Sequence, residues 1–248
     1  MLPNHFDDDV AAHYDETHAP QFDPVVIART VDLLAELAGD GAALELAVGT
    51  GRIALPLADR GVPVSGIELS TAMAERLRSK DRAERIPVTI GDMATTRVEG
   101  TFRVVYLVYN TIGNLTTQEQ QVACFANAAA HLEPGGCFVV EVGVPDLRRL
   151  PPGEDARVFS HAPGYVGYVG YDRYIDLVAQ QAESHHFRAE GSHISEVRTQ
   201  FRYVWPSELD LMARLAGLAL RNRWAGWDRT PFTGGSPSHV SVWQTAAG

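Results

Sequence analysis

The sequence has few of the residues and segments that define several protein classes. Only two of its 248 residues are cysteines, Cys124 and Cys137, so neither a disulfide framework nor a thiolate zinc site is expected. This low cysteine content favours a reducing compartment. The longest wholly apolar runs, such as residues 104–109, are far shorter than the roughly 18 to 20 residues that cross a bilayer. Residues 1–9 lack the basic and apolar regions of a secretory signal. The sequence therefore predicts a cytoplasmic protein that has no membrane partner.

Positive charge is also scarce. The chain has 21 Lys and Arg residues against 31 Asp and Glu residues, which gives a formal net charge of −10. A protein that binds the phosphates of a nucleic acid usually has the opposite balance, so no nucleic-acid partner is expected. The first forty residues hold nine acidic residues and one basic residue, a net of −8, and the rest of the chain is close to neutral. The acidity is therefore concentrated at one end.

Patterns of metal ligands are missing as well. The nine histidines are scattered, and no pair is spaced as H-x-x-x-H on an expected helix. Neither cysteine has the surroundings of a nucleophile. We therefore expect no metal site.

Short apolar runs alternate with helical patterns through the first 145 residues. Strands separated by helices of about ten to fifteen residues favour right-handed crossovers and a parallel sheet covered on both faces. The sequence thus predicts a doubly wound, Rossmann-like α/β unit. Strands are expected over 42–47, 62–67, 87–90, 104–109 and 137–142, and helices over 25–38, up to 59, over 70–79 and over 117–131.

The pattern changes after residue 145. Residues 157–205 hold runs rich in β-branched and aromatic residues, which predict the antiparallel strands of an inserted cap. A helix over 206–217 and strands over 219–227 and 239–245 follow. We predict one domain with three parts: an N-terminal helical segment (1–40), an α/β core (41–145 and 206–248) and an inserted cap (146–205).

A glycine turn after the first expected strand indicates a nucleotide site. Gly49 and Gly51 let backbone approach a ligand and expose the N–H groups of a helix start. Glu68 follows Gly49 by nineteen residues and ends the next strand, where a carboxylate can accept both ribose hydroxyls. A nicotinamide-dependent oxidoreductase remains an alternative because residues 49–54 also fit G-x-G-x-x-A, and a nonreactive nucleotide-binding module is a third. Glu45 disfavours a pyrophosphate there, whereas it suits the cationic amino-acid end of S-adenosylmethionine.

A run of landmarks in this order resembles the class I S-adenosylmethionine-dependent methyltransferases. Residues 45–52 (ELAVGTGR) resemble motif I, usually E/D-x-G-x-G-x-G, in which Ala47 replaces the first glycine. Residues 91–93 (GDM) resemble the adenine-binding motif, 109–115 (YNTIGNL) motif IV, and 134–136 (PGG) the turn before the fifth strand. The resemblance implies a seven-stranded sheet, S-adenosylmethionine as cofactor and S-adenosylhomocysteine as product.

The resemblance also implies roles for individual residues. Glu68 would bind the ribose, Met73 would pack on adenine, and Asp92 and the Met93 amide would bind the adenine edge. Residues 11–15 resemble the lid of small-molecule members such as amino-sugar N-methyltransferases and the glycine N-methyltransferase group, which places Tyr14 near the cofactor. The resemblance thus implies that residues 1–40 are a lid, that the α/β core binds S-adenosylmethionine and that residues 146–205 are a substrate cap. The full set expected to bind the cofactor is Tyr14, Glu45, Ala47, Gly49, Gly51, Arg52, Glu68, Leu69, Met73, Asp92, Met93, Tyr109 and Asn110.

The cap supplies candidates for acceptor binding and proton transfer. His185 and His186 are adjacent, so in a strand they point to opposite faces, and we expect at most one of them to face the site. Together with Tyr14 they are the catalytic candidates. The residues expected to line the acceptor pocket are Asn114, Tyr168, Tyr171, Arg202, Tyr203 and Trp205.

These features predict methyl transfer to a small-molecule acceptor by a monomer or homodimer. The acceptor atom is an amine or a hydroxyl of an amino acid, an amino sugar or a natural-product scaffold, with a slight preference for an amine because the lid is acidic. An NAD(P)-dependent oxidoreductase is the alternative. We hypothesise that acids such as Asp7, Asp8 and Asp9 help to retain a sulfonium ligand or to attract an amine.

Overall fold

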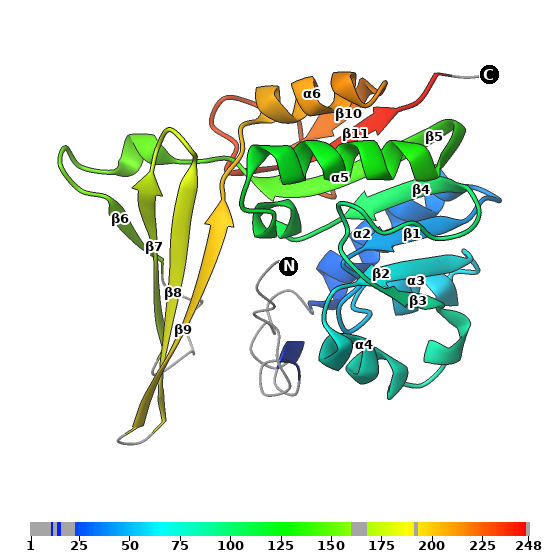
Figure 1. Ribbon diagram of the computed structural model, residues 1–248, viewed down its shortest axis with the longest axis horizontal. Helices are drawn as coiled ribbons and strands as arrows, with labels where there is room; N and C mark the ends of the chain where they lie inside the picture. Colours follow the sequence, from blue (N-terminus) through cyan, green and yellow to red (C-terminus); the bar gives the residue numbers. More distant parts are fainter. Residues whose placement is uncertain (1–10, 12–13, 16–22, 160–167, 191–192, 247–248) are drawn as a thin grey trace.

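A seven-stranded sheet forms the centre of the computed structural model, which describes residues 11, 14–15, 23–159, 168–190 and 193–246 (Figure 1). The strand order is β10-β11-β5-β4-β1-β2-β3, and β11 runs opposite to its two neighbours while the others are parallel. This confirms the expected doubly wound sheet. Its strands are β1 (Ala43–Leu46), β2 (Val64–Glu68), β3 (Val88–Ile90), β4 (Phe102–Leu107), β5 (Leu132–Gly143), β10 (Ala219–Trp224) and β11 (Ser238–Gln244).

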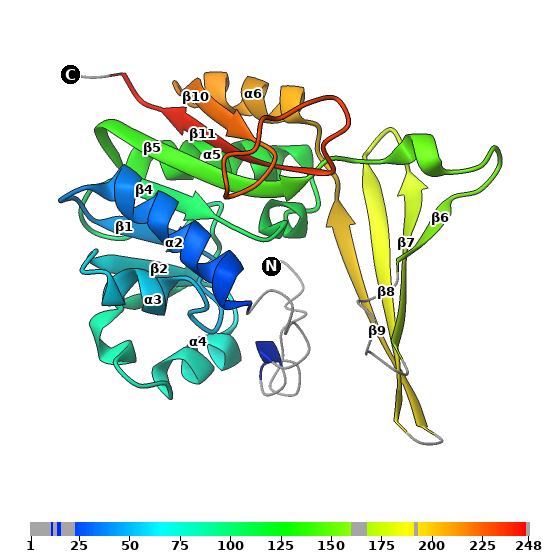
Figure 2. The same cartoon turned by 180° about the vertical axis from the view of Figure 1, so that it is seen from behind.

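Helices cover both faces of this sheet. Figure 1 shows α5 (Gln118–His131) and α6 (Pro206–Leu215) in front of it, and Figure 2, from behind, shows α2 (Pro24–Ala38) and α3 (Ala54–Asp59). Two apolar clusters fill the layers: one joins Phe125 of α5 and Trp243, and the other joins Leu34 of α2 and Leu57 of α3. Residues 24–38 of the predicted lid therefore pack on the sheet as α2, whereas Asp7, Asp8 and Asp9 lie outside the described residues. The division into lid, core and cap stays a prediction.

Local sequence explains where the elements begin and end. Thr117 caps α5 by a capping box with Gln120, and Pro206 occupies the first turn of α6. The strand after α5 begins at Leu132, earlier than expected, because residues 132–136 still pair with their neighbours across a register shift. Strand β10 ends at Trp224, earlier than expected, because Ala225 N–H donates to the carbonyl of Thr230 and closes a turn.

A second, antiparallel sheet interrupts the core between β5 and α6, which confirms the inserted β cap. Its order is β6-β7-β8-β9, and Figures 1 and 2 show it standing beside the main sheet. The insert meets the core at the turn after β4, η3 (Thr111–Asn114). A Cβ on Gly113 would lie 3.3 Å from the carbonyl oxygen of Arg202 and 3.6 Å from Cβ of Phe201. The strands of the insert are β6 (Ala156–Phe159), β7 (Tyr168–Asp176), β8 (Gln181–Glu190) and β9 (His193–Arg202).

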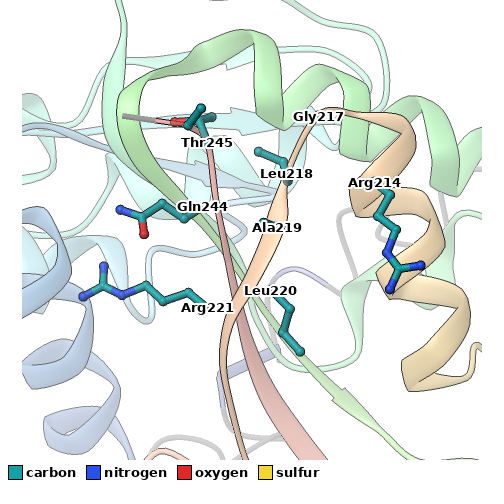
Figure 3. Close-up of a pocket in the computed structure, with 9 residues that line it drawn as sticks. Arg214, Gly217, Leu218, Ala219, Leu220, Arg221, Gln244 and Thr245 are labelled. Atoms are coloured by element: carbon teal, nitrogen blue, oxygen red, sulfur yellow. The ribbon is translucent and has the colours of Figure 1, made fainter. Parts of the chain in front are cut away.

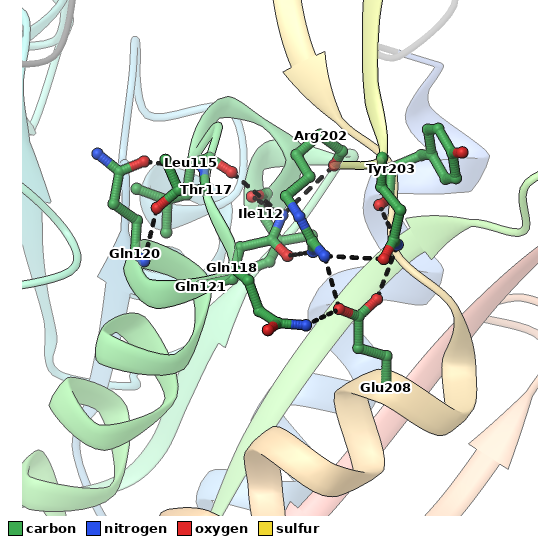
Figure 4. Close-up of polar contacts among 10 residues, drawn as sticks. Ile112, Leu115, Thr117, Gln118, Gln120, Gln121, Arg202, Tyr203 and Glu208 are labelled. Carbon is green, nitrogen blue, oxygen red and sulfur yellow. Dashed lines mark hydrogen bonds and ion pairs between the residues drawn. The ribbon is translucent and has the colours of Figure 1, made fainter. Parts of the chain in front are cut away.

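A buried arginine joins the insert to the core (Figure 4). The guanidinium of Arg202, at the end of β9, donates to Gln121 of α5 at 2.5 Å, to Gln180 at 2.9 Å and to Glu208 of α6 at 2.7 Å. Its side chain is only 3% exposed. Gln121 in turn donates to the carbonyl of Ile112. The junction therefore depends on a charge that is fully paired, and removal of one partner would leave the other buried and uncompensated.

We expect Arg202→Met to destabilise the protein by about 3 kcal/mol, because it leaves Glu208 without its buried cation. Urea unfolding followed by circular dichroism measures this change. The control is Arg173→Met, which makes the same substitution in an ion pair with Asp155 whose side chains are 55% and 54% exposed. An exposed pair contributes at most about 1 kcal/mol. Equal losses in the two variants would contradict the role given to the junction.

Candidate active site

The chain turns sharply where β1 ends. Ala47 (φ 57°), Gly49 (φ 56°) and Gly51 (φ 80°) all adopt left-handed backbone. Glycine is favoured in this conformation, so the usual glycine of motif I at the position of Ala47 has a physical reason. A Cβ on Gly49 would lie 3.5 Å from Cε of Met73, which places Met73 of α4 (Thr71–Arg78) against the turn. The turn therefore presents backbone, with few side chains, to whatever binds above it.

Glu68 closes this turn from the neighbouring strand. Its Oε2 accepts the Gly49 N–H at 2.7 Å and its Oε1 accepts the Ser70 N–H at 2.9 Å. Burial raises the pKa of Glu68, while the amides of Ser70, Gly49 and Leu69 oppose that shift. The carboxylate thus lies between the glycine turn and the start of α4, and Leu69 contributes backbone.

Glu45 is a buried carboxyl on β1, beneath the turn. It is 3% exposed, and the Tyr106 hydroxyl donates to its Oε2 at 2.9 Å. Burial raises the pKa of Glu45 to about 8, whereas the bond from Tyr106 and the charge of Arg52 lower it. A site with such a carboxyl favours a cationic ligand, which would stabilise the ionised form.

A third acid follows the next strand. Asp92 Oδ1 accepts the Ala94 N–H at 2.8 Å, and the Met93 carbonyl accepts from Asn127 at 2.7 Å. The Gly91 N–H donates to the carbonyl of Glu68 at 2.8 Å, so the ends of β2 and β3 are adjacent. The structure therefore brings Glu68, Asp92 and the glycine turn to one edge of the sheet, as their positions after parallel strands predict.

Two further left-handed residues end the segment after β4. Tyr109 has φ 55° and Asn110 has φ 58°. The guanidinium of Arg52 lies 5.7 Å from the centre of the Tyr109 ring, and Asn110 Oδ1 accepts the Gly143 N–H at 2.6 Å. This turn therefore contacts the residues that follow β1. Asn114, predicted to line the pocket, is exposed on η3.

The N-terminal residues that the structure describes are tied to the same place. Asp15 accepts from Thr50 Oγ1 at 2.6 Å and from Lys80 Nζ at 2.6 Å, and Lys80 also donates to the Thr50 carbonyl at 2.8 Å. Burial and the neighbouring Tyr109 raise the pKa of Tyr14 well above its ordinary value. Tyr14 is therefore a neutral phenol beside the glycine turn.

The insert has two chemically different faces. His186 contacts the Tyr168 hydroxyl through Nδ1 and Ser184 Oγ through Nε2, the latter at 3.0 Å. Burial and Tyr109 raise the pKa of Tyr168 to about 12. This face therefore approaches the core at Tyr109, and Asp172 lies on it, directly opposite Ser184.

His185 lies on the opposite face, as the alternation in a strand predicts. Its ring stacks on Tyr171 at 4.5 Å between centroids, its Nδ1 contacts Glu196 at 2.8 Å, and its Nε2 lies 3.4 Å from Glu183. The structure therefore does not bring His185 and Tyr171 to the face that carries His186.

The end of the insert also departs from the expected acceptor pocket. Arg202 is used within the junction, and Tyr203 is buried with its ring 5.4 Å from that of Tyr174. Trp205 precedes α6 and is 38% exposed. The partners of Arg202 on α5 and α6 are distant from it in sequence, so its place in the junction could not be foreseen.

Several residues near the site were missed in the sequence. Ser184 shares a face with His186 by simple alternation, so that signal was available. Asp172 needed the β7–β8 register, and the Asp15–Lys80 contact joins residues that are 65 positions apart. Glu141, described below, was read only as part of a buried strand.

A surface pocket lies away from the glycine turn (Figure 3). It is formed by the end of α6, the start of β10 and the end of β11. Gln244 pairs with Cys137, which pairs in turn with Val104 near the start of β4, so this pocket is at the amino edge of the parallel strands, opposite the glycine turn. It is lined by Arg214, Gly217, Leu218, Ala219, Leu220, Arg221, Gln244, Thr245 and Ala246.

Two features are missing from the part of the chain that the structure describes. None of its helices is both long and apolar enough to span a membrane. Among the same residues, no group of three or more His, Cys, Asp or Glu side chains is arranged to hold a metal ion.

Comparisons with known proteins identify the family of this chain. A family model described as a methyltransferase domain matches residues 43–136. The CcbJ methyltransferase from Streptomyces caelestis is 35% identical, with a TM-score of 0.86 over 98% of this chain and 99% of that one. A dTDP-3-amino-3,4,6-trideoxy-alpha-D-glucopyranose N,N-dimethyltransferase from Streptomyces venezuelae is 31% identical over 140 residues, 52% of this chain and 58% of that protein. A dTDP-4-amino-2,3,4,6-tetradeoxy-D-glucose N,N-dimethyltransferase from Saccharopolyspora spinosa is 30% identical over 141 residues, 52% of this chain and 55% of that protein.

The chain belongs to the class I S-adenosylmethionine-dependent methyltransferases. It is thus a methyltransferase whose cofactor is S-adenosylmethionine, and the nicotinamide-dependent alternative is set aside. The chain spans a little over half the length of the two curated relatives, both of which are amino-sugar N,N-dimethyltransferases.

The raised pKa of Glu45 gives a test of its burial. Below about pH 4.5 this carboxyl is neutral in the folded and the unfolded chain; between 4.5 and about 8 only the unfolded chain ionises, so stability falls as pH rises. Glu45→Gln removes this effect. We expect the variant's free energy of unfolding, relative to wild type, to rise by up to about 1.4 kcal/mol per pH unit across that window.

Urea unfolding of both proteins at several pH values between 5 and 8.5 measures the difference. Any effect of packing the amide is independent of pH and shifts all points equally. A difference that stays constant with pH would show that Glu45 keeps an ordinary pKa.

Proposed function

We propose that this enzyme transfers the methyl group of S-adenosylmethionine to an amine of a small acceptor, an amino sugar or a related natural-product scaffold. The observation that carries the proposal is the buried carboxyl of Glu45, bonded to Tyr106, beneath a turn bordered by tyrosines. Such a site favours cations over anions, because carboxyl groups and aromatic rings interact well with positive charge and poorly with phosphate. The N-methyltransferase relatives support an amine over a hydroxyl.

The residues at the sheet edge fit the parts of the cofactor. We assign the ammonium group to Glu45, the ribose hydroxyls to Glu68, and the adenine edge to Asp92 and the Met93 amide, with Met73 on the adenine ring. Ala47, Gly49 and Gly51 supply close backbone approach, and Leu69 flanks the ribose acid. Arg52, Tyr109, Asn110 and Tyr14 border the end that carries the methyl group.

The reaction needs alignment more than activation. S-adenosylmethionine carries its methyl group on a positively charged sulfur, so the acceptor nitrogen forms the new N–C bond while the C–S electron pair returns to sulfur. The protein must hold the nitrogen in line and exclude water. Tyr14, Tyr109 and Tyr168, which come from three separate segments, would enclose that position.

We propose that His186 is the base that accepts the proton of the acceptor amine, and that the Tyr168 hydroxyl relays this proton to it. The Tyr168 hydroxyl is protonated at neutral pH, and burial raises its pKa further, to about 12. It can therefore give its own proton to His186 as it accepts one from the amine. Ser184 bonds the other ring nitrogen of His186 and so orients it. His185, the second candidate, faces Glu183 and Glu196 on the far side of the insert.

The central test is methyl transfer from labelled S-adenosylmethionine to paired acceptors. The panel should match nucleotide-linked amino sugars and secondary amines with the corresponding sugars and alcohols that lack nitrogen. We expect labelled product with amines only, because a neutral amine is already a nucleophile and gives its proton to His186, whereas a hydroxyl attacks only if a stronger base removes its proton. Transfer to the alcohols but not the amines would overturn the proposal. Binding of S-adenosylhomocysteine by calorimetry is measured beside it.

The assignment of the insert faces is tested by two matched variants. Tyr168→Phe and Tyr171→Phe each remove one hydroxyl, from opposite faces of the same strand. We expect Tyr168→Phe to lower kcat at least about tenfold at pH 7 with little change in cofactor affinity, because the path to His186 is lost.

Tyr171→Phe should leave kcat within about twofold of wild type, since this ring stacks on His185 away from the core. Equal kcat values for the two variants, whether both are high or both low, would show that the faces are assigned wrongly. Steady-state kinetics with the best acceptor of the panel provides the comparison.

A further inference from the structure

The turn after β4 holds two residues in a conformation that is unusual for them. Tyr109 and Asn110 are consecutive and both left-handed, with φ 55° and 58°. A left-handed conformation is unfavourable for a bulky residue such as tyrosine, and it persists only where the surroundings fix it. Some specific contact must therefore hold this turn in shape.

Strand β5 supplies that contact through one residue. Glu141 Oε2 accepts the Tyr109 N–H at 2.9 Å, and the Glu141 main-chain carbonyl accepts the Asn110 N–H at 3.1 Å. Two residues further along, the Gly143 N–H donates to Asn110 Oδ1 at 2.6 Å. The turn is thus fastened to the end of β5 at three points, one of which uses a charged side chain.

The second carboxylate oxygen of Glu141 is also engaged. Oε1 accepts the indole N–H of Trp227 at 2.8 Å, and Trp227 is 8% exposed in the apolar cluster on the α2 face, where Tyr109 also packs. Two N–H donors from different segments therefore meet the two oxygens of one carboxylate. Glutamate satisfies both, whereas glutamine has only one accepting oxygen.

The geometry points to Glu141 as a positioning residue for methyl transfer: its carboxylate holds the left-handed Tyr109–Asn110 turn so that the Tyr109 ring faces the reacting centre. The ring lies against Arg52 of the glycine turn and influences both Tyr14 and Tyr168. Glu141 itself acts only through the turn. This role rests on the proposed function, because it takes the Tyr109 ring to border the methyl group.

Four proteins test the inference: wild type, Trp227→Phe, Glu141→Gln and the double variant. In Glu141→Gln the amide presents one oxygen and one NH₂ group to two N–H donors, so one contact is lost. In the double variant the indole donor is gone, and the oxygen can turn to the Tyr109 N–H. Addition of Trp227→Phe to Glu141→Gln should therefore restore the contact with the Tyr109 N–H.

The first readout is hydrogen exchange of the Tyr109 amide, followed by mass spectrometry on peptides that cover residues 108–115. We expect exchange in Glu141→Gln to be about tenfold faster than in wild type, and in the double variant to return to within about threefold of Trp227→Phe. This readout needs no ligand. Equal exchange in Glu141→Gln and the double variant, or no change in either, would contradict the inference that Glu141 holds the Tyr109–Asn110 turn.

The second readout is the dissociation constant of S-adenosylhomocysteine by calorimetry. We expect it to rise about tenfold in Glu141→Gln and to recover in the double variant. Rescue of exchange without any change in this constant or in kcat would overturn the positioning role. If wild type itself fails to bind S-adenosylhomocysteine, the proposed function fails, and hydrogen exchange alone still decides whether Glu141 clamps the turn.

Discussion

Left-handed backbone at the ends of the two central strands is the constraint on which the site depends. The chain leaves β1 through Ala47 and Gly49, and it leaves the β4 segment through Tyr109. These turns carry N–H groups that neither a strand nor a helix satisfies, and such groups need partners when they are buried. Each receives a carboxylate from the outer neighbouring strand: Glu68 of β2 for the first turn and Glu141 of β5 for the second. The strand order β5-β4-β1-β2 makes this symmetry possible.

Burial then sets the chemistry of the edge. Because Glu45 and Glu68 are almost completely buried, their carboxyl groups are harder to ionise than in water. Burial also makes the bordering phenols of Tyr14 and Tyr168 harder to ionise. A cation that binds beside these carboxyl groups stabilises their ionised form, whereas an anion would destabilise it further. The same packing that stabilises the turns therefore also selects the charge of the ligand.

Much of the core was predictable because its signals are local. Short apolar runs that alternate with helical patterns located the strands. Glu45, Glu68 and Asp92 were recognised as candidate site residues from their positions at or near strand ends. Contacts between distant segments were not predictable. Alternation placed His185 and His186 on opposite faces, but only the register of the insert shows which face approaches Tyr109.

In the proposed function, the acceptor half of the site comes from a different part of the chain than the cofactor half. The matching methyltransferase domain covers residues 43–136, which includes the glycine turn and the acids, whereas Tyr168 and His186 lie in the insert beyond it. The insert is held to the core by the Arg202 junction and approaches it at η3. Cofactor chemistry can therefore stay constant while changes on one face of β7 and β8 alter the acceptor. For the same reason, similarity to relatives that match only the core is informative about how this enzyme binds its cofactor. It is less informative about which acceptor the enzyme uses.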